Sequence, residues 1–302
     1  MYLEHFGLRE PPFSLTPDTS FIFASATHQE ALNTLLVAAR GGEGFIKIVG
    51  EVGNGKTLLC RKFLATLSAD KTAARFVTAY IPNPYLDPRS LLLALAGEFR
   101  IEVASTIDQH HLLKALTLAL LNFAREGKRV LVCLDEAQAM PLESLEVLRL
   151  LTNLETEKRK LMQVVLFGQP ELDERLTHNS VRQLRQRISF QYRLRGLRKD
   201  ELHRYLRHRL QVAGYSGEPP FRRSAVATLH YATRGTPRLV NILAHKALLL
   251  AYGEGLRQVT SRHLHRAISD TPEARKDLRG WLWGSLAALG LLMLMLSGGW
   301  QR

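Results

Sequence analysis

Eight consecutive residues combine three glycines with a lysine and a hydroxyl side chain. They read Gly50-Glu51-Val52-Gly53-Asn54-Gly55-Lys56-Thr57 and fit the pattern G-x-x-x-x-G-K-[ST] without a mismatch. Glycines let backbone N–H groups approach phosphate closely, and the helical pattern that follows adds a positive dipole end. We therefore predict that this loop, together with Leu58, binds ATP, with Lys56 on the β- and γ-phosphates and Thr57 on Mg²⁺. A chance glycine-rich turn is the alternative.

A pair of carboxylates follows an apolar run later in the chain. The run Val130–Leu134 reads VLVCL, and Asp135 and Glu136 come directly after it. Because parallel sheets bind ligands at the carboxyl ends of their strands, we expect this pair beside the phosphate-binding loop. Asp135 is predicted to hold Mg²⁺, directly or through water, and Glu136 to polarise the attacking water. The alternative is a loop that simply begins with acidic residues.

Strand-like and helical patterns alternate up to about Leu197. Runs such as VLVCL and MQVVLF are typical of strands buried on both faces of a parallel sheet. The expected strands are 45–49, 76–81, 130–134, 162–167 and 188–194. Helices are expected at 58–67, 91–99, 112–124 and 142–154, and beyond Leu197 at 200–213, 224–233, 238–251 and 261–269.

Two helix starts carry capping signals. Thr27-His28-Gln29-Glu30 predicts a capping box, and Asp87-Pro88 predicts an N-cap followed by proline at the first helical position. The patterns together predict an α/β domain with a parallel sheet flanked by helices at 27–196. An N-terminal arm at 1–26 is expected before it, and a small all-helical domain at 197–270 and a linker at 271–280 are expected after it.

The segment 281–300 reads WLWGSLAALGLLMLMLSGGW and carries no charged residue. About twenty apolar residues suffice for a helix to cross a hydrocarbon core of roughly 30 Å. Tryptophans stand at both ends, where interfacial aromatics belong, and Arg275, Lys276 and Arg279 precede the segment. We predict one C-terminal transmembrane helix with the bulk of the chain in the cytoplasm. A buried core helix is the alternative.

The chain is strongly basic, with 41 Lys+Arg against 28 Asp+Glu and a net charge of +13. Such a balance suggests nucleic acid, anionic lipid or nucleotide phosphates as partners. The stretch 182–209 is especially rich in arginine and lysine, and it has three interpretations: a solvated face with one functional arginine, a lipid-facing surface, or a DNA-backbone surface. His110-His111 has no evident acidic partner and is interpreted as helix surface. Only two cysteines occur, which fits a reducing compartment.

Several segments together resemble a known family. The chain resembles AAA+ ATPases of the ExeA/GspA (general secretion pathway A) type, which include MshM-like ATPases of MSHA type IV pilus biogenesis. The resemblance lies in the phosphate-binding loop, the LDE strand end, FGQPEL at 167–172, RQLRQRI at 182–188 and GTPRLVN at 235–241. The opening is similar as well, through Phe6-Gly7-Leu8, Pro12-Phe13, Thr16-Pro17-Asp18 and the helix start His28-Gln29-Glu30-Ala31-Leu32. The resemblance covers about residues 1–270. It implies a P-loop AAA+ fold with a helical lid.

The resemblance also implies roles for three further residues. Gln169 matches sensor 1, which orients the attacking water. Arg187 matches the arginine finger that acts on a neighbouring subunit's ATP, with Arg182 or Arg185 as alternatives. Arg238 matches sensor 2, which couples the lid to the nucleotide. A finger that acts in trans implies a ring, which we expect to be a hexamer.

The expected function is a membrane-anchored ATPase at the bacterial inner membrane that helps to assemble a type IV pilus or type II secretion machine with other inner-membrane proteins. Many GspA-type proteins continue into a periplasmic domain that binds peptidoglycan, whereas this chain ends two residues after Trp300. We therefore expect a partner to perform any cell-wall binding. The alternatives are a DNA-binding helper of transposition or replication, and a nucleotide-switched scaffold with slow hydrolysis.

Overall fold

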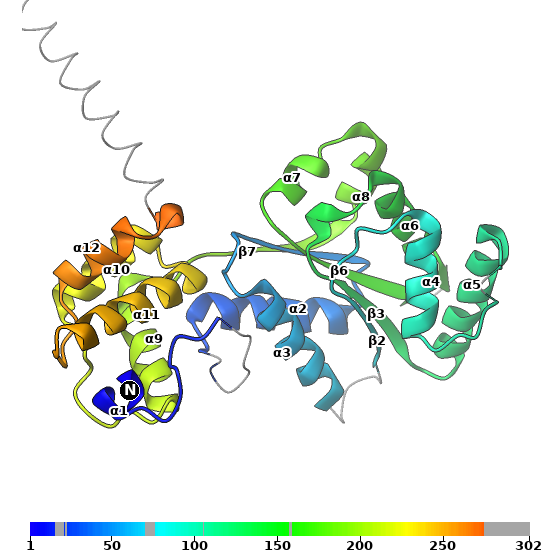
Figure 1. Ribbon diagram of the computed structural model, residues 1–302. Coiled ribbons are helices and arrows are strands. Elements are labelled where there is room, and N and C mark those ends of the chain that lie inside the picture. The colour runs from blue at the N-terminus through cyan, green and yellow to red at the C-terminus, as the bar shows by residue number, and fades with distance from the viewer. Residues whose placement is uncertain (16–20, 22, 70–75, 105, 157–158, 275–302) are drawn as a thin grey trace, which may run out of the picture. The chain divides into compact units, whose positions relative to one another are not determined.

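The computed structural model describes residues 1–15, 21, 23–69, 76–104, 106–156 and 159–274 (Figure 1). The chain forms two compact units. The α/β unit is Ala24–Arg195, and the helical unit joins Met1–Phe23 to the chain from Gly196 onward. The first 23 residues therefore belong to the helical unit, whereas the sequence predicted a separate arm over 1–26.

Five parallel strands form the sheet of the α/β unit, in the order β2-β3-β6-β1-β7. The strands predicted from the apolar runs are all present. Their bounds are β1 (Phe45–Gly50), β2 (Phe76–Ile81), β3 (Arg129–Leu134), β6 (Met162–Gly168) and β7 (Ile188–Leu194). A short hairpin of β4 (Glu155–Thr156) and β5 (Arg159–Lys160), which the sequence did not predict, precedes β6.

Helices cover both faces of this sheet because its central strands are apolar on both sides. The helices of the unit are α2 (Ala26–Gly41), α3 (Lys56–Ala69), α4 (Pro88–Glu98), α5 (Gln109–Arg125), α6 (Leu142–Thr152), α7 (Glu171–Arg175) and α8 (Arg182–Arg185). In β3, Val130 and Val132 pack into the core beneath α4, α5 and α6, whereas Leu131 and Cys133 pack into the core beneath α2 and α3 (Figure 1).

One of the two predicted caps is correct. The Asp87 carboxylate caps α4 by accepting from the N–H groups of Arg89 and Ser90, and Pro88 opens the helix. The predicted capping box at Thr27 is wrong, because α2 begins two residues earlier and its N-cap is Ser25. The Thr27 hydroxyl instead lies 3.3 Å from the Tyr192 hydroxyl, and the Glu30 carboxylate accepts from Tyr192 at 2.6 Å. These contacts join the first turn of α2 to β7.

The helical unit is built from α1 (Tyr2–Phe6), α9 (Lys199–Val212), α10 (Arg223–Thr233), α11 (Pro237–Gly253) and α12 (Ser261–Ser269). Apolar residues of the first 23 positions, such as Phe6, Leu8 and Phe13, share its core. Thr271 and Ala274, which the sequence assigned to a linker at 271–280, are buried, and Ala274 belongs to that core.

Arg209 fastens the N-terminal segment to the helical unit. The side chain is 7% exposed, and its guanidinium donates to the carbonyl oxygens of Pro12 at 2.6 Å and Ser14 at 3.0 Å. The same guanidinium lies 4.4 Å from the centre of the Phe21 ring. Arg209 therefore does not belong to a solvent-facing basic surface, as the interpretation of 182–209 as one basic stretch assumed.

The predicted transmembrane helix at 281–300 lies outside the described residues. Among the helices that the structure describes, none has both the length and the apolar character needed to cross a bilayer.

We expect Arg209→Ala to lower the free energy of unfolding of the helical unit by about 2–4 kcal/mol, because two main-chain carbonyls lose a charged donor and the Phe21 ring loses its partner. Urea denaturation would measure the loss, and limited proteolysis would show earlier cleavage within the first 23 residues. Arg207→Ala, at an exposed position of the same helix, is the matched control. Equal stability of the two variants would refute the fastening role.

Candidate active site

The predicted phosphate-binding loop is a tight turn between β1 and α3. Gly50 ends the strand, Lys56 begins the helix, and Gly53 and Gly55 both adopt φ of +83°. Side chains are disfavoured at such φ values, so these two positions require glycine. Glu51 and Val52 are exposed at the tip of the loop, Gly55, Thr57 and Leu58 are partly buried, and Asn54 is buried. The conformation is that of an anion-binding turn at a helix N-terminus.

Asn54 anchors this loop to the rest of the α/β unit. Its side chain is 2% exposed, and its amide Nδ2 donates to the carbonyl oxygen of Leu194 at 3.2 Å. Its own carbonyl oxygen lies 2.9 Å from Nε2 of His28, a residue of α2. The loop is therefore held from the end of β7 and from the first turn of α2.

The Lys56 ammonium lies inside the loop. It is 5% exposed and donates to the carbonyl oxygens of Gly50 at 2.7 Å and Glu51 at 3.2 Å. Burial lowers the pKa of Lys56, and the nearby carboxylates of Glu136 and Asp135 oppose that shift. The arrangement places a positive charge where the sequence predicts the β- and γ-phosphates.

Oxygen ligands suited to Mg²⁺ gather beside this lysine. Asp135 follows β3 and is 2% exposed, and the Thr57 hydroxyl hydrogen-bonds its carboxylate. Burial raises the pKa of Asp135, and the Thr57 hydroxyl and the Glu136 N–H counteract part of that rise. A divalent cation would stabilise the ionised carboxylate, so Thr57 and Asp135 fit Mg²⁺, a hard cation that prefers oxygen.

Glu136 is held in a special conformation by two amides. Its φ of 53° lies in the left-handed region, which is uncommon for residues other than glycine and is frequent at functional sites. Its Oε2 accepts from Gln138 Nε2 at 2.6 Å and from Gln169 Nε2 at 3.0 Å. Burial raises the pKa of Glu136, but the two amide donors and the Lys56 charge together outweigh it, so the net shift is downward and the ionised carboxylate is favoured.

The structure thus brings Lys56, Asp135, Glu136 and Gln169 together at the carboxyl ends of β1, β3 and β6. Gln169 directly follows β6, where the resemblance placed sensor 1. Their catalytic roles stay predictions.

The arginines to which the resemblance assigned roles lie in two different units and differ in exposure. Arg187 is partly buried between α8 and β7 in the α/β unit, whereas Arg182 and Arg185 are exposed. Arg238 is exposed in the first turn of α11, in the helical unit. The basic stretch 182–209 is divided between the two units at Gly196, so it is not a single surface of one unit.

Three residues of the site were not assigned a role in it from the sequence. Gln138 lies two residues after Glu136, and its Oε1 accepts from the N–H of Gln169 at 3.0 Å. Tyr80, in the neighbouring strand β2, donates to Asp135 Oδ2 at 3.4 Å, and burial with the Asp135 charge raises the pKa of Tyr80 to about 12. His28 contacts the loop from α2. For Gln138, its place next to the acidic pair is a usable sequence signal; the other two depend on tertiary contacts.

The expectation that His110-His111 lacks an acidic neighbour is wrong. Asp108 caps α5, and its Oδ2 lies 2.5 Å from His111 Nδ1, with His110 close by. All three residues are exposed. Their hydrogen bonds are those of a helix cap, in which the N–H and ring of His111 lower the pKa of Asp108.

Comparison with known proteins agrees with this geometry. A family model described as an AAA domain matches residues 39–176. The chain is also 40% identical to general secretion pathway protein A of Aeromonas hydrophila over 303 residues, which cover 100% of this chain and 54% of that protein. Residues 39–176 thus match an AAA domain, and the chain as a whole is similar to general secretion pathway protein A. The family resemblance drawn from the sequence is confirmed, and the chain spans about half the length of this relative.

Comparison with solved structures shows which proteins have a similar fold. Cdc6p from Pyrobaculum aerophilum aligns with a TM-score of 0.62 and 18% identity over 86% of this chain and 70% of that one. Aeropyrum pernix ORC2, in its ADPNP–ADP complexes, aligns with a TM-score of 0.61 and 18% identity over 86% of this chain and 71% of that one. At such low identity the likeness establishes the α/β P-loop fold and gives no information on whether this chain binds DNA.

We expect Gln169→Leu to move the acidic limb of the ATPase pH profile to higher pH. The reason is that Glu136 is predicted to act as a base when it is ionised. Loss of a donor to its carboxylate removes one of the contacts that lower its pKa, so its pKa should rise. Single-turnover rates against pH would measure the shift. Gln186→Leu, which removes an exposed amide of the same unit, is the control. An acidic limb unchanged in Gln169→Leu would contradict the arrangement.

Proposed function

We propose that this ATPase works at the bacterial inner membrane, where ATP hydrolysis supports the assembly of a type II secretion or type IV (MSHA-like) pilus machine. The observation that carries the proposal is the 40% identity to general secretion pathway protein A along the whole chain. The clustered Lys56, Asp135, Glu136 and Gln169 support the catalytic part of it.

The chain's own residues would divide the work. The loop 50–58 would cradle the phosphates with its N–H groups, and Lys56 would bind the β- and γ-phosphates. Thr57 and Asp135 would hold Mg²⁺, which supplies charge neutralisation on the phosphates when bound. Glu136 would accept a proton from the attacking water, and Gln169 and Gln138 would hold the carboxylate ionised and correctly turned.

A ring, which we expect to be a hexamer, would complete the site. In that ring Arg187 of one subunit would stabilise the transition-state charge on the ATP of its neighbour. Arg238 would report the nucleotide state to the helical unit. Physical support comes from the place of Arg187, which directly precedes β7, the strand that anchors the phosphate-binding loop through Leu194.

The uncharged segment 281–300 supports a single-pass membrane anchor with the ATPase on the cytoplasmic side. Inner-membrane proteins of the assembly machine would be the partners.

We expect Arg187→Ala to lower kcat for ATP about 10³-fold or more while ATP binding stays within about threefold, the behaviour of a finger supplied in trans. Wild-type turnover per subunit is expected to rise with protein concentration. Arg185→Ala and Arg182→Ala serve as controls and as the alternative fingers. Turnover that is independent of concentration and unchanged in all three variants would refute the ring.

The proposed function is tested in cells that depend on the protein for pilus assembly or secretion. We expect Glu136→Gln, which retains the shape of the side chain but removes the base, to bind ATP and abolish assembly. We also expect removal of residues 281–302 to release the chain from the membrane fraction and to abolish assembly. Full assembly with Glu136→Gln would favour the nucleotide-switched scaffold. Assembly that survives the truncation, together with DNA binding at physiological salt, would favour the DNA-binding alternative.

A further inference from the structure

One peptide group of the phosphate-binding loop is hydrogen-bonded by a side chain from outside the loop. It is the peptide between Asn54 and Gly55, whose carbonyl oxygen lies 2.9 Å from His28 Nε2. A peptide group is planar and trans, so its C=O and N–H point in opposite directions. Whatever fixes the Asn54 carbonyl therefore also fixes the direction of the Gly55 N–H, one of the N–H groups expected to bind phosphate.

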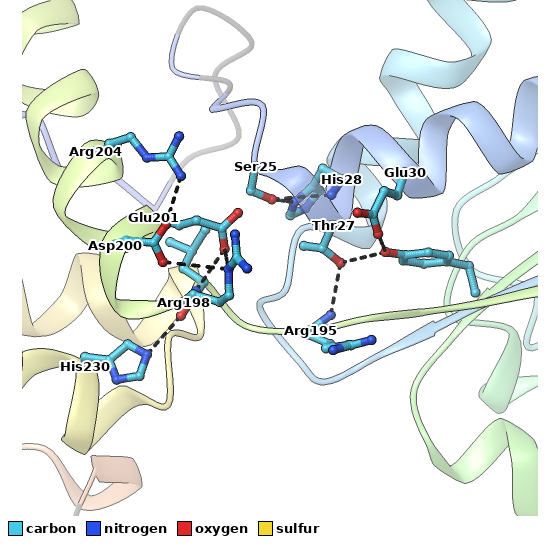
Figure 2. A network of polar contacts seen from close by, with 12 residues as sticks. Ser25, Thr27, His28, Glu30, Arg195, Arg198, Asp200, Glu201, Arg204 and His230 are labelled. Carbon is cyan, nitrogen blue, oxygen red and sulfur yellow. Dashed lines mark hydrogen bonds and ion pairs between the residues drawn. The ribbon is translucent and has the colours of Figure 1, made fainter.

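The Asn54 carbonyl determines that Nε2 of His28 carries a proton. A carbonyl oxygen can only accept, so Nε2 is the donor to Asn54. Nδ1 lies 2.6 Å from the Ser25 hydroxyl, which can donate to it (Figure 2). Ser25 is 2% exposed and is also the N-cap of α2, accepting from the His28 N–H. Neutral His28 thus satisfies both contacts, and the ring is held at both nitrogens.

The first turn of α2, which carries His28, is itself fixed in the α/β unit. The Thr27 hydroxyl accepts from the N–H of Arg195 at 3.5 Å, and Tyr192 donates to Glu30 (Figure 2). The end of β7 is thereby joined to α2, and through Leu194 it also holds the Asn54 side chain. The end of β7 therefore holds both the phosphate-binding loop and the helix turn that carries His28.

Steric fit gives a second, independent argument. A Cβ added to Gly55 would lie 2.9 Å from His28 Nε2, closer than side-chain carbons normally approach. Gly55 also has a φ of +83°. A glycine between two flexible peptide groups can rotate readily, so the loop needs an external contact to hold this peptide in one orientation.

We propose that His28 is a positioning residue for phosphate binding, which turns the Gly55 N–H toward the phosphates by donating to the Asn54 carbonyl. The inference rests on the proposed role of the loop in binding ATP and adds a residue that lies outside the loop's sequence pattern. It also accounts for Ser25, which acts as an orienting partner of the imidazole.

Two amide substitutions distinguish the contribution of Nε2 from that of Nδ1. In His28→Gln the side-chain amide reaches about as far as Nε2 and can still donate to Asn54. In His28→Asn the shorter amide matches Nδ1 and cannot reach that carbonyl. We expect the Kd of the full-length chain for inorganic pyrophosphate and for ADP, measured calorimetrically, to rise about tenfold in His28→Asn and to stay within about threefold of wild type in His28→Gln. Gln29→Leu, at the next position of the helix, is the control and should bind as wild type does.

Wild-type affinity in His28→Asn, or equal losses in the Asn and Gln variants, would overturn the inference. If His28→Asn does not fold, His28→Leu, which keeps the volume without the donor, must show the same loss relative to His28→Gln. Lys56→Ala distinguishes the two levels of the proposal. Pyrophosphate binding that survives Lys56→Ala would refute the loop as the phosphate site. Binding that is lost in Lys56→Ala but normal in His28→Asn would refute only the role of His28.

Discussion

A buried ammonium group is the interaction on which the site depends. Lys56 is almost fully removed from solvent, and burial works against its charge. Two groups of partners compensate: the carbonyl oxygens of Gly50 and Glu51, and the carboxylates that follow β3. The loop must be tight for the carbonyls to reach the ammonium, and the central strands must end in register for the carboxylates to surround it.

The sheet meets this second requirement through its topology. β1 and β3 both flank β6, so the loop after β1, the acidic pair after β3 and Gln169 after β6 meet at one edge. The electrostatic outcome differs for the two acids. Asp135 is almost fully buried, and burial raises its pKa in spite of the hydrogen bonds that it accepts, so a bound cation would stabilise its ionised form. Glu136 has two amide donors and a lowered pKa, which suits a carboxylate that stays ionised next to water.

Much of this arrangement could be predicted from the sequence, because the loop, the acidic pair and the buried strands are local patterns. Apolar runs identified each strand of the sheet, and Asp87-Pro88 identified the start of α4. The failures concern contacts between distant residues. Ser25, and not Thr27, caps α2, because the Thr27 hydroxyl accepts from the N–H of Arg195 at the end of β7. Arg209 is basic in sequence but is buried against Pro12 and Ser14. His28 was identified only as part of a helix start, since its partner Asn54 lies on another element.

The most direct test of the account is a structure of the full-length chain with Mg²⁺ and a non-hydrolysable ATP analogue. The account predicts the β- and γ-phosphates within the loop 50–58, with Lys56 on their oxygens, Mg²⁺ between Thr57 and Asp135, and the His28 contact to Asn54 retained. An analogue bound elsewhere in the molecule, with Lys56 still on the carbonyls of Gly50 and Glu51, would contradict it.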